Sequence, residues 1–258
     1  MCPRLGRALG YPGRSSMVCH VLLVEAPGGL VLVDTGLGLL DIAGPANRLG
    51  RGFLAAARPC LDVAETAASQ VSRLGFALAD VRHIVVTHLD LDHAGGIADF
   101  PDALVHVYAP EHRAATLRAT MREKHRYRTQ QVEPAPRWSL YEERGETWKG
   151  LSAVSGLEGL DEGILLVPLS GHTRGHCGIA VQDERGWLLH AGDSYFHHRE
   201  LEGRRAPLPI ELLESALQMD RTARHRNQAR LAELHRGGEV RIFCAHDPNE
   251  YVDFGGVL

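Results

Sequence analysis

Residues 87–96, THLDLDHAGG, decide how this sequence is interpreted. Within six positions they place four side chains of kinds that bind metals in proteins: His88, Asp90, Asp92 and His93. The stretch continues an apolar run, residues 81–87, that predicts a buried strand. Chains that alternate strands and helices place ligand sites at the carboxyl ends of strands. A polar loop with histidine caps is the alternative, but imidazoles and carboxylates this crowded predict a bound cation.

The bulk composition is that of a soluble globular protein. The chain has 258 residues, of which 44% are apolar and 23% charged. This length suits one large domain or two small ones, and we expect a single domain spanning 1–258. The net charge of −4 gives no reason to expect nucleic acid or an anionic membrane as partner. The 15 histidines are the unusual feature and favour metal binding.

Cysteine usage indicates a reducing compartment. The five cysteines, an odd number at wide spacing with no C-x-x-C, are Cys2, Cys19, Cys60, Cys177 and Cys244. A disulfide framework is therefore not expected, and a cytoplasmic location is. Residues 1–20 contain no continuous apolar segment, so no signal peptide is expected, and no run approaches the roughly 18 apolar residues of a membrane span.

The order of the expected elements, strands, a helix, strands, helices and then the same again, indicates an α/β (α+β) fold of two sheets packed on each other with helices outside. The expected strands are 18–26 and 30–33 (a hairpin), 81–87, 103–108, 164–169, 179–182, 187–190 and 240–244. The expected helices are 62–75, 110–120 and 209–235.

Residues 112–150 are rich in arginine and aromatic side chains, among them Arg122, Arg126 and Arg128. We interpret this segment as a cap or lid inserted over the scaffold, and the alternative is a solvated helix face followed by a loop. As a pocket wall, the segment would favour a small anionic substrate. Either this segment or the helix 209–235 could pair two subunits in a homodimer.

Three later segments also place histidine or aspartate just beyond a predicted strand. They are residues 171–176 (GHTRGH), 191–195 (AGDSY) and 245–247 (AHD). If the strand ends converge, four histidines and three aspartates come together. That is enough for two divalent ions sharing one carboxylate.

This ordered set of motifs resembles the metallo-β-lactamase superfamily of metal-dependent hydrolases, whose fold is the αββα sandwich. The family's His-x-His-x-Asp-His motif is matched by residues 88–93, with Asp90 in place of the second histidine. The resemblance implies one metal bound by His88, Asp90 and His172 and a second bound by Asp92, His93 and His246. Asp193 would bridge them, and Asp34 would support the ligands from outside.

Residues 192–195, GDSY, are similar to the N-acyl homoserine lactonase branch of this family. That similarity implies that Tyr195 contacts a substrate carbonyl, and the alternative is a packed aromatic ring at a strand end. Asp92 or Asp193 would carry the proton to the leaving group. Outside the ligand set, His176 is expected to be structural, and His197 or His198 could touch substrate.

Asp90 changes the expected chemistry of the centre. A third aspartate brings the formal charge of two divalent ions, their ligands and a bridging hydroxide from about plus one to about zero. The cluster should be a weaker Lewis acid, and a hard oxygen ligand makes iron or manganese more competitive with zinc. The alternative is that Asp90 points away and its metal site is weakly filled.

The resemblance implies a hydrolase that cleaves a small ester, lactone or thioester with a metal-bridging hydroxide, using two divalent ions, zinc first. Two other classes stay open. One is an iron-dependent oxidoreductase of the thiol dioxygenase kind, and the other is a metal-binding protein without catalysis.

Overall fold

Two mixed sheets form the centre of the molecule. The computed structural model describes residues 4–7, 16–132, 137–154 and 156–256. The first sheet is five-stranded, in the order β3 (Leu22–Ala26), β4 (Gly29–Val33), β5 (Val81–Val85), β6 (Leu104–Tyr108) and β7 (Arg137–Tyr141). The second is four-stranded, in the order β10 (Ile164–Pro168), β11 (Cys177–Asp183), β12 (Gly186–His190) and β13 (Val240–Phe243). Two short pairs accompany them: β1 (Arg4–Arg7) with β2 (Ser16–Val18), and β8 (Glu146–Trp148) with β9 (Leu151–Ala153).

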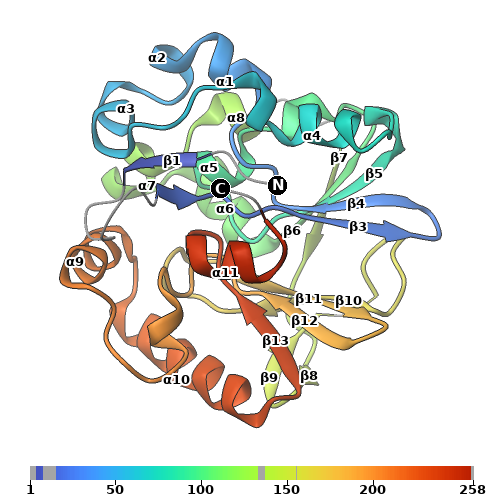
Figure 1. The fold of residues 1–258 in the computed structure, drawn as a ribbon, viewed down its shortest axis with the longest axis vertical. Coiled ribbons are helices and arrows are strands. Elements are labelled where there is room, and N and C mark those ends of the chain that lie inside the picture. The colour runs from blue at the N-terminus through green and yellow to red at the C-terminus, as the bar shows by residue number, and fades with distance from the viewer. Residues whose placement is uncertain (1–3, 8–15, 133–136, 155, 257–258) are drawn as a thin grey trace.

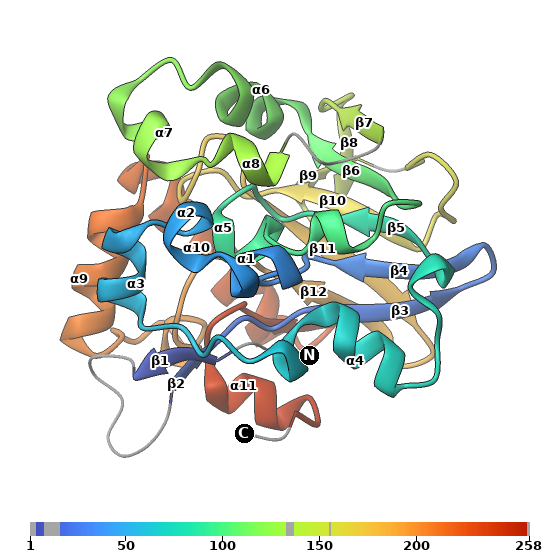
Figure 2. The same cartoon turned by 90° about the horizontal axis from the view of Figure 1, so that it is seen from above.

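Helices cover the outer faces of both sheets. Those around the first sheet are α1 (Leu39–Ala43), α2 (Pro45–Arg48), α3 (Arg51–Ala57), α4 (Ala67–Arg73), α5 (Leu91–Ala94), α6 (Ala109–Leu117), α7 (Met121–Arg126) and α8 (Thr129–Val132). Those around the second are α9 (Leu208–Leu217), α10 (Arg221–Gly237) and α11 (Pro248–Asp253). Figure 1 shows the two sheets stacked, with α4 above and α10 below, and Figure 2 shows the same arrangement from above.

Alternating side chains explain the layers. On β4, Val31 and Val33 face the second sheet, whereas Leu30 and Leu32 join the outer core with α4. On β10, Ile164 and Leu166 face inward, and Leu165 and Val167 pack toward α10. Because successive residues of a strand point to opposite faces, strands apolar on both faces require a cover on each side. The predicted four-layer αββα sandwich is confirmed.

The N-terminal hairpin is shorter than the sequence suggested. Its first strand begins at Leu22, not at Val18. The preceding residues pair instead with the segment after β13: Val18 N donates to His246 O (3.3 Å) and His20 N donates to Ala245 O (2.8 Å). An early part of the chain is thereby joined to a late one.

The helix expected over 62–75 is broken, and the prediction was wrong in its first turn. Residues 63–65 form a separate 3₁₀ turn, and α4 begins only at Ala67. Thr66 is extended (ψ 148°), and its hydroxyl accepts a hydrogen bond from Ser69 N at 3.2 Å. A threonine N-cap therefore starts the helix four residues after the expected Asp62 cap.

The single helix expected over 209–235 is two helices. Gln218 is extended (ψ 140°) and ends α9, and Asp220 caps α10 by accepting from Ala223 N at 2.9 Å. The break frees backbone donors for another loop: Met219 N and Asp220 N both donate to Gly171 O, at 2.8 and 2.9 Å. A tertiary contact thus overrides a continuous helical pattern.

The segment 112–150, expected as an inserted cap, contains scaffold. Its strand β7 pairs in parallel with β6 at the edge of the first sheet, and most of α6 packs on that sheet. Residues 133–136 lie outside the described residues. The part between α6 and β7 that the structure describes, with α7 and α8, runs along the side of the molecule visible in Figure 2. In the described part of the chain, no helix combines the length and apolarity needed to cross a membrane.

Helix α9 buries a glutamate. The Glu214 carboxylate lies beside Glu200 and 3.1 Å from the Arg224 guanidinium, and both glutamates accept from Phe196 N. Burial, reinforced by the charge of Glu200, raises the pKa of Glu214 to about 9 from an ordinary 4.5. The folded chain therefore holds a proton that the unfolded chain releases above pH 4.5.

This proton makes stability depend on pH. Between pH 5 and 9 the free energy of unfolding should fall by up to about 5 kcal/mol through Glu214, because the folded state binds more protons over that window. Glu214→Gln should remove this part of the fall and make the variant the more stable protein at pH 9. Urea unfolding at pH 5, 7 and 9 measures both. Identical pH profiles for variant and wild type would contradict the assignment.

Candidate metal centre

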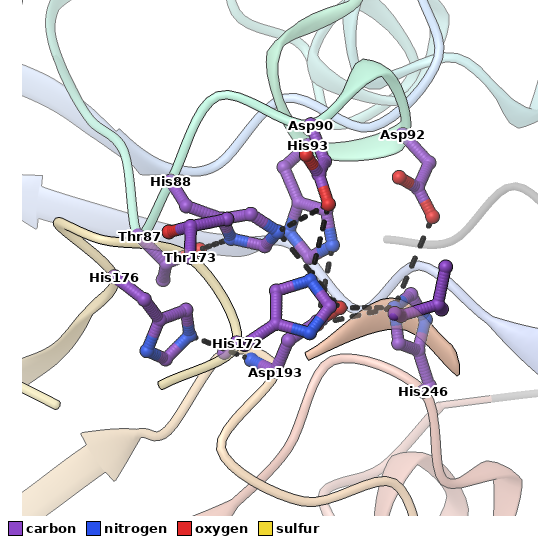
Figure 3. A network of polar contacts seen from close by, with 12 residues as sticks. Thr87, His88, Asp90, Asp92, His93, His172, Thr173, His176, Asp193 and His246 are labelled. Carbon is purple, nitrogen blue, oxygen red and sulfur yellow. Dashed lines mark hydrogen bonds and ion pairs between the residues drawn. The ribbon is translucent and has the colours of Figure 1, made fainter. Parts of the chain in front are cut away.

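Four strand ends bring the predicted ligands together. The loop after β5 carries His88, and α5, which follows it, carries His93. The loop between β10 and β11 carries His172, the turn after β12 carries Asp193, and the segment after β13 carries His246. Figure 3 shows these side chains pointing at one another across the junction of the two sheets.

Asp193 lies at the middle of the group. Its Oδ1 is 3.1 Å from His246 Nε2 and 3.2 Å from His93 Nε2. Its Oδ2 is 3.3 Å from His172 Nε2 and 3.8 Å from His88 Nε2. His246 Nε2 also lies 3.2 Å from Oδ2, so imidazoles surround both carboxylate oxygens, as a carboxylate shared by two metal ions requires.

Asp90 points into the cluster. Its Oδ2 lies 3.0 Å from His172 Nε2 and 3.4 Å from His88 Nε2, on the side away from His246. It also lies 3.5 Å from a guanidinium nitrogen of Arg126, a side chain that is itself buried. The alternative in which Asp90 turns away from the site does not describe this structure.

Asp92 lies at the rim of the cluster. Its Oδ2 is 3.8 Å from His246 Nε2, a longer separation than those around Asp193. Its side chain keeps 14% of its surface exposed, against 4% for Asp193. Asp92, with Asp90 at 15% exposed, is therefore better placed than Asp193 to exchange protons with solvent.

Groups outside the cluster fix the orientation of the ligands. Asp34 Oδ2 accepts from His93 Nδ1 (2.8 Å) and from the Thr87 hydroxyl (2.7 Å), and Thr87 N donates to Oδ1. His176 donates from Nδ1 to Leu169 O and accepts the Asp193 N–H at Nε2 (2.8 Å). Such outer contacts set the tautomer and direction of metal-binding side chains. Both residues have the supporting position that the sequence suggested.

Glu111 on α6 ties two ligand loops together. One carboxylate oxygen accepts from Leu89 N and from the Tyr127 hydroxyl, both at 3.0 Å. The other accepts from the Thr173 hydroxyl (2.7 Å) and from Gly175 N (3.0 Å). The loop that carries His88 to His93 and the loop that carries His172 are therefore held by one buried acid.

Removing this acid should weaken both fold and site. Glu111→Ala leaves buried donors without a partner, so we expect the free energy of unfolding to fall by about 2–4 kcal/mol. Metal affinity should fall by about 10–100-fold, as for other outer contacts of metal sites. Glu142, an exposed partner of Arg113, provides the control, and Glu142→Ala should change neither quantity measurably. Equal effects of the two substitutions, in denaturant unfolding and chelator competition, would refute the role of Glu111.

The His172 loop is also held from α7 and from the break between α9 and α10. Arg126 donates to His172 O at 2.9 Å and to Leu217 O. Met219 N donates to His172 O at 3.1 Å, and Asn227 donates to Ser170 O at 2.7 Å. Arg126, one of the basic residues of segment 112–150, thus contacts both this loop and Asp90.

Burial and neighbouring charges shift the pKa values of the cluster in different directions. Burial lowers the pKa of His172 to about 4, so this imidazole is neutral at neutral pH and can offer a ring nitrogen to a metal ion. Despite burial, the carboxylates of Asp193 and Asp34 hold the pKa of His93 well above its usual value. Burial alone would also raise the pKa of Asp193, but the nearby imidazoles of His246 and His93 hold it well below its usual range. A metal ion that binds to these side chains must therefore displace the protons that they carry.

Unpaired buried atoms show that the residues fit metal ions. Among the described residues, four atoms of this cluster are buried and have no hydrogen-bond partner: His88 Nε2, Asp90 Oδ1, His93 Nε2 and Asp193 Oδ1. Burying polar atoms without partners is costly, and here all four are nitrogen or oxygen donors of the kind that zinc, iron and manganese accept. The fit is to divalent cations rather than to an organic cofactor.

Tyr195 does not reach this cluster, which contradicts the predicted contact with a substrate carbonyl. Its side chain is fully buried in the core beneath α10, and its hydroxyl donates to Glu250 Oε1 at 2.9 Å. The next residue, Phe196, lies against the ligands instead, with ring centroids 5.9 Å from His172 and 4.9 Å from His246. The packed-aromatic alternative describes Tyr195.

His197 and His198 lie together beside the site. His198 Nδ1 donates to Asp247 Oδ2 at 2.7 Å, and the His197 and His198 ring centroids are 4.3 Å apart. Asp247 also caps α11 and accepts from His198 N. These contacts support a structural role for the pair.

Sequence reasoning missed the roles of Glu111 and of the Arg126–Asp90 contact. Glu111 follows Pro110 at the start of an expected helix, where an acid is ordinary. Arg126 was one of several basic residues in its segment. A buried charge has no local signature, so only the three-dimensional contacts distinguish these two.

Comparison with known proteins agrees with the geometry. The family model described as metallo-beta-lactamase superfamily matches residues 16–222. A Mycobacterium tuberculosis protein named as a probable metallo-hydrolase is 46% identical over 239 residues, covering 92% of this chain and 76% of its own. An N-acyl homoserine lactonase of Rhizobium radiobacter is 37% identical over 81 residues, 31% of this chain and 30% of its own.

A solved N-acyl homoserine lactone hydrolase, with N-hexanoyl-L-homoserine bound at its catalytic metal centre, superimposes with a TM-score of 0.69 at 20% identity, covering 98% of this chain and 92% of that one. At this identity the likeness concerns the fold. The match to the family model and the mycobacterial relative show that the chain belongs to the metallo-β-lactamase superfamily.

Proposed function

We propose that this metallo-hydrolase opens a lactone or cleaves a small ester at a dinuclear metal centre. The observation that carries the proposal is the set of four buried imidazoles around Asp193, which divide into two groups, each containing one Nε2 atom without a hydrogen-bond partner. His88 and His172 meet one side of the Asp193 carboxylate, and His93 and His246 meet the other. The family and the named relatives support hydrolysis as the reaction type.

The donor groups suggest the assignment of the ligands. His88, Asp90 and His172 would hold one ion, and Asp92, His93 and His246 the other, with Asp193 shared between them. When bound, two divalent ions supply a water made acidic enough to act as nucleophile near neutral pH, and they polarise the carbonyl oxygen. Zinc suits this donor set, and Asp90 brings iron and manganese into competition.

The protein's own groups would then position substrate and move protons. Phe196 lines the ligands with an apolar ring, which suits an acyl or ring carbon more than a charged group. Asp92, at the rim, can accept the proton of the nucleophile and return it to the leaving oxygen. Arg126 directs its N–H groups to His172 O, Leu217 O and Asp90. We therefore do not assign this arginine to the binding of a charged substrate.

The test is a substrate screen on protein of known metal content. The zinc, manganese and iron forms would be assayed with lactones, linear esters and thioesters of matched acyl length. We expect lactone hydrolysis to have the highest kcat/KM, and N-acyl homoserine lactones are the first choice because named relatives hydrolyse them. Failure of all three classes with two metals bound would overturn the proposal.

One specific observation favours a second candidate. His88, His172 and Asp90 form a set of two histidines and one carboxylate, the ligand type of non-haem iron oxygenases. A single iron there could support oxidation of a thiol by oxygen. Oxygen uptake with small thiols by the iron form, absent from the zinc form, would select this candidate.

A further inference from the structure

A cysteine lies beside the second group of donors. The Cys19 sulfur, a carboxylate oxygen of Asp92 and a ring nitrogen of His246 lie within 4.8 Å of one another. Cys19 is 2% exposed. It comes from the segment before β3, far in sequence from both partners and outside every motif that indicated the metal centre.

The backbone places this sulfur. Hydrogen bonds on either side of Cys19 join Val18 N to His246 O and His20 N to Ala245 O. The imidazole of His246 turns its Nδ1 to Val18 O at 2.7 Å, which leaves Nε2 facing Asp193 and Asp92. The segment that orients the His246 imidazole therefore also places the Cys19 sulfur beside it.

Two buried atoms that make no hydrogen bond also indicate a cation at this point. His93 Nε2 and Asp193 Oδ1 are buried, have no hydrogen-bond partner and lie 3.2 Å apart, and Asp193 Oδ1 is also 3.1 Å from His246 Nε2. Around a zinc ion, donors at about 2.0–2.3 Å are separated by about 3.2–3.8 Å. The atoms of the Cys19 group need to approach one another by at most about 1–1.6 Å to reach that spacing.

We propose that Cys19 is a thiolate ligand of the second metal ion, a role that rests on the proposed dinuclear centre. On binding, the thiol releases its proton to solvent and a sulfur–metal bond forms, with no change in oxidation state. The second ion would then be held by Cys19 with Asp92, His93, Asp193 and His246.

The proposal makes the two metal positions chemically different. The first, with Asp90, offers only nitrogen and oxygen donors, whereas the second gains a soft sulfur. Soft thiolates select zinc, and carboxylate-rich sites suit iron and manganese better. We therefore expect zinc to fill the second position first, and iron or manganese to compete mainly for the first.

Cobalt spectroscopy tests the sulfur ligand without any activity assay. Wild-type protein loaded with two Co²⁺ ions should show the near-ultraviolet absorption of a sulfur-to-cobalt charge transfer. Cys19→Ser should lose this band. Cys244→Ala is the matched control, because Cys244 is also buried and lies two residues before His246, and its band should be unchanged. In chelator competition, Cys19→Ser should bind one of its two zinc ions about 10–100-fold more weakly.

Each outcome decides the matter. A wild-type protein with two bound cobalt ions and no such band overturns the proposal, even if the serine variant does not fold. A band that survives in folded Cys19→Ser overturns it as well. A wild-type band lost in Cys19→Ser, together with no hydrolysis of any lactone or ester, would keep the sulfur ligand and reject the proposed function.

Discussion

Asp193→Asn is expected to reduce the bound metal from two ions per chain to one at most, and to lower kcat/KM by at least 100-fold. The estimate is conservative, because loss of outer contacts alone costs about 10–100-fold at metal sites. The amide keeps the size of the side chain but removes the negative charge shared by four imidazoles. The NH₂ group of the asparagine would also take the place of a carboxylate oxygen whose lone pair a metal ion needs.

Elemental analysis of the purified variant gives the metal content, and steady-state kinetics on the best substrate gives the rate. Asp183→Asn is a suitable control, because Asp183 is an exposed carboxylate paired with Arg241 at the end of β11. It should bind two ions and retain full activity. Two ions bound by Asp193→Asn, with kcat/KM within tenfold of wild type, would show that Asp193 does not bridge.

The second large effect concerns Asp90 and Arg126. Asp90→Asn leaves the buried guanidinium of Arg126 without its carboxylate, which should lower the free energy of unfolding of the metal-free protein by about 3 kcal/mol. Although burial alone would raise it, the charge of Arg126 and contacts from His172 hold the pKa of Asp90 well below its usual range. The carboxylate is therefore charged, and its loss is a loss of charge.

A double-mutant cycle separates this pair from the other contacts of Arg126. Arg126→Met removes the bonds to His172 O and Leu217 O in both backgrounds, so that cost cancels. We expect Asp90→Asn to cost about 2 kcal/mol less in the Arg126→Met background than in wild type. Chelator competition on the same four proteins should show weaker metal binding for Asp90→Asn and tighter binding for Arg126→Met, because a cation beside the site repels the metal. Additive effects on stability would mean that the pair has no net interaction.

If the pair behaves in this way, it resolves the charge question raised by the sequence. The extra aspartate removes one positive charge from the centre by formal counting, and Arg126 returns one. The Lewis acidity of the metals need not be lower than in relatives with histidine at this position. Asp90 then changes which metals are preferred more than how strongly they polarise a substrate.

The sequence predicted the sandwich and the ligand set because both depend on local patterns. Strand 81–85 and the ligands after it are adjacent in sequence, and each later ligand also follows its own strand. The convergence of these strand ends was only a condition of the prediction, and the structure meets it because β10, β12 and β13 run in the same direction and end at one edge of their sheet. The continuous apolar runs of β4 and β10 similarly indicated that each sheet is covered on both faces.

What could not be predicted depends on contacts between distant segments. The interruption at Gln218 satisfies the backbone of the His172 loop, and no helical pattern contains that information. Tyr195 was placed by analogy with a tyrosine two residues after the shared aspartate, whereas here its hydroxyl has a buried acceptor in Glu250. Glu111 and Cys19 contact loops that are far away in sequence, and no pattern in a single sequence predicts such contacts.

The pairing of residues 18–20 with residues 245–246 has a consequence for the order of events during synthesis. Ribosomes add about 5–20 residues each second, so the last histidine appears roughly ten seconds or more after the segment that orients it. Until then the nascent polypeptide exposes a half-built cluster of imidazoles and carboxylates with nothing to close it. Assembly of the complete cluster must therefore follow the synthesis of residue 246, and a polypeptide released before that residue would lack the fourth imidazole.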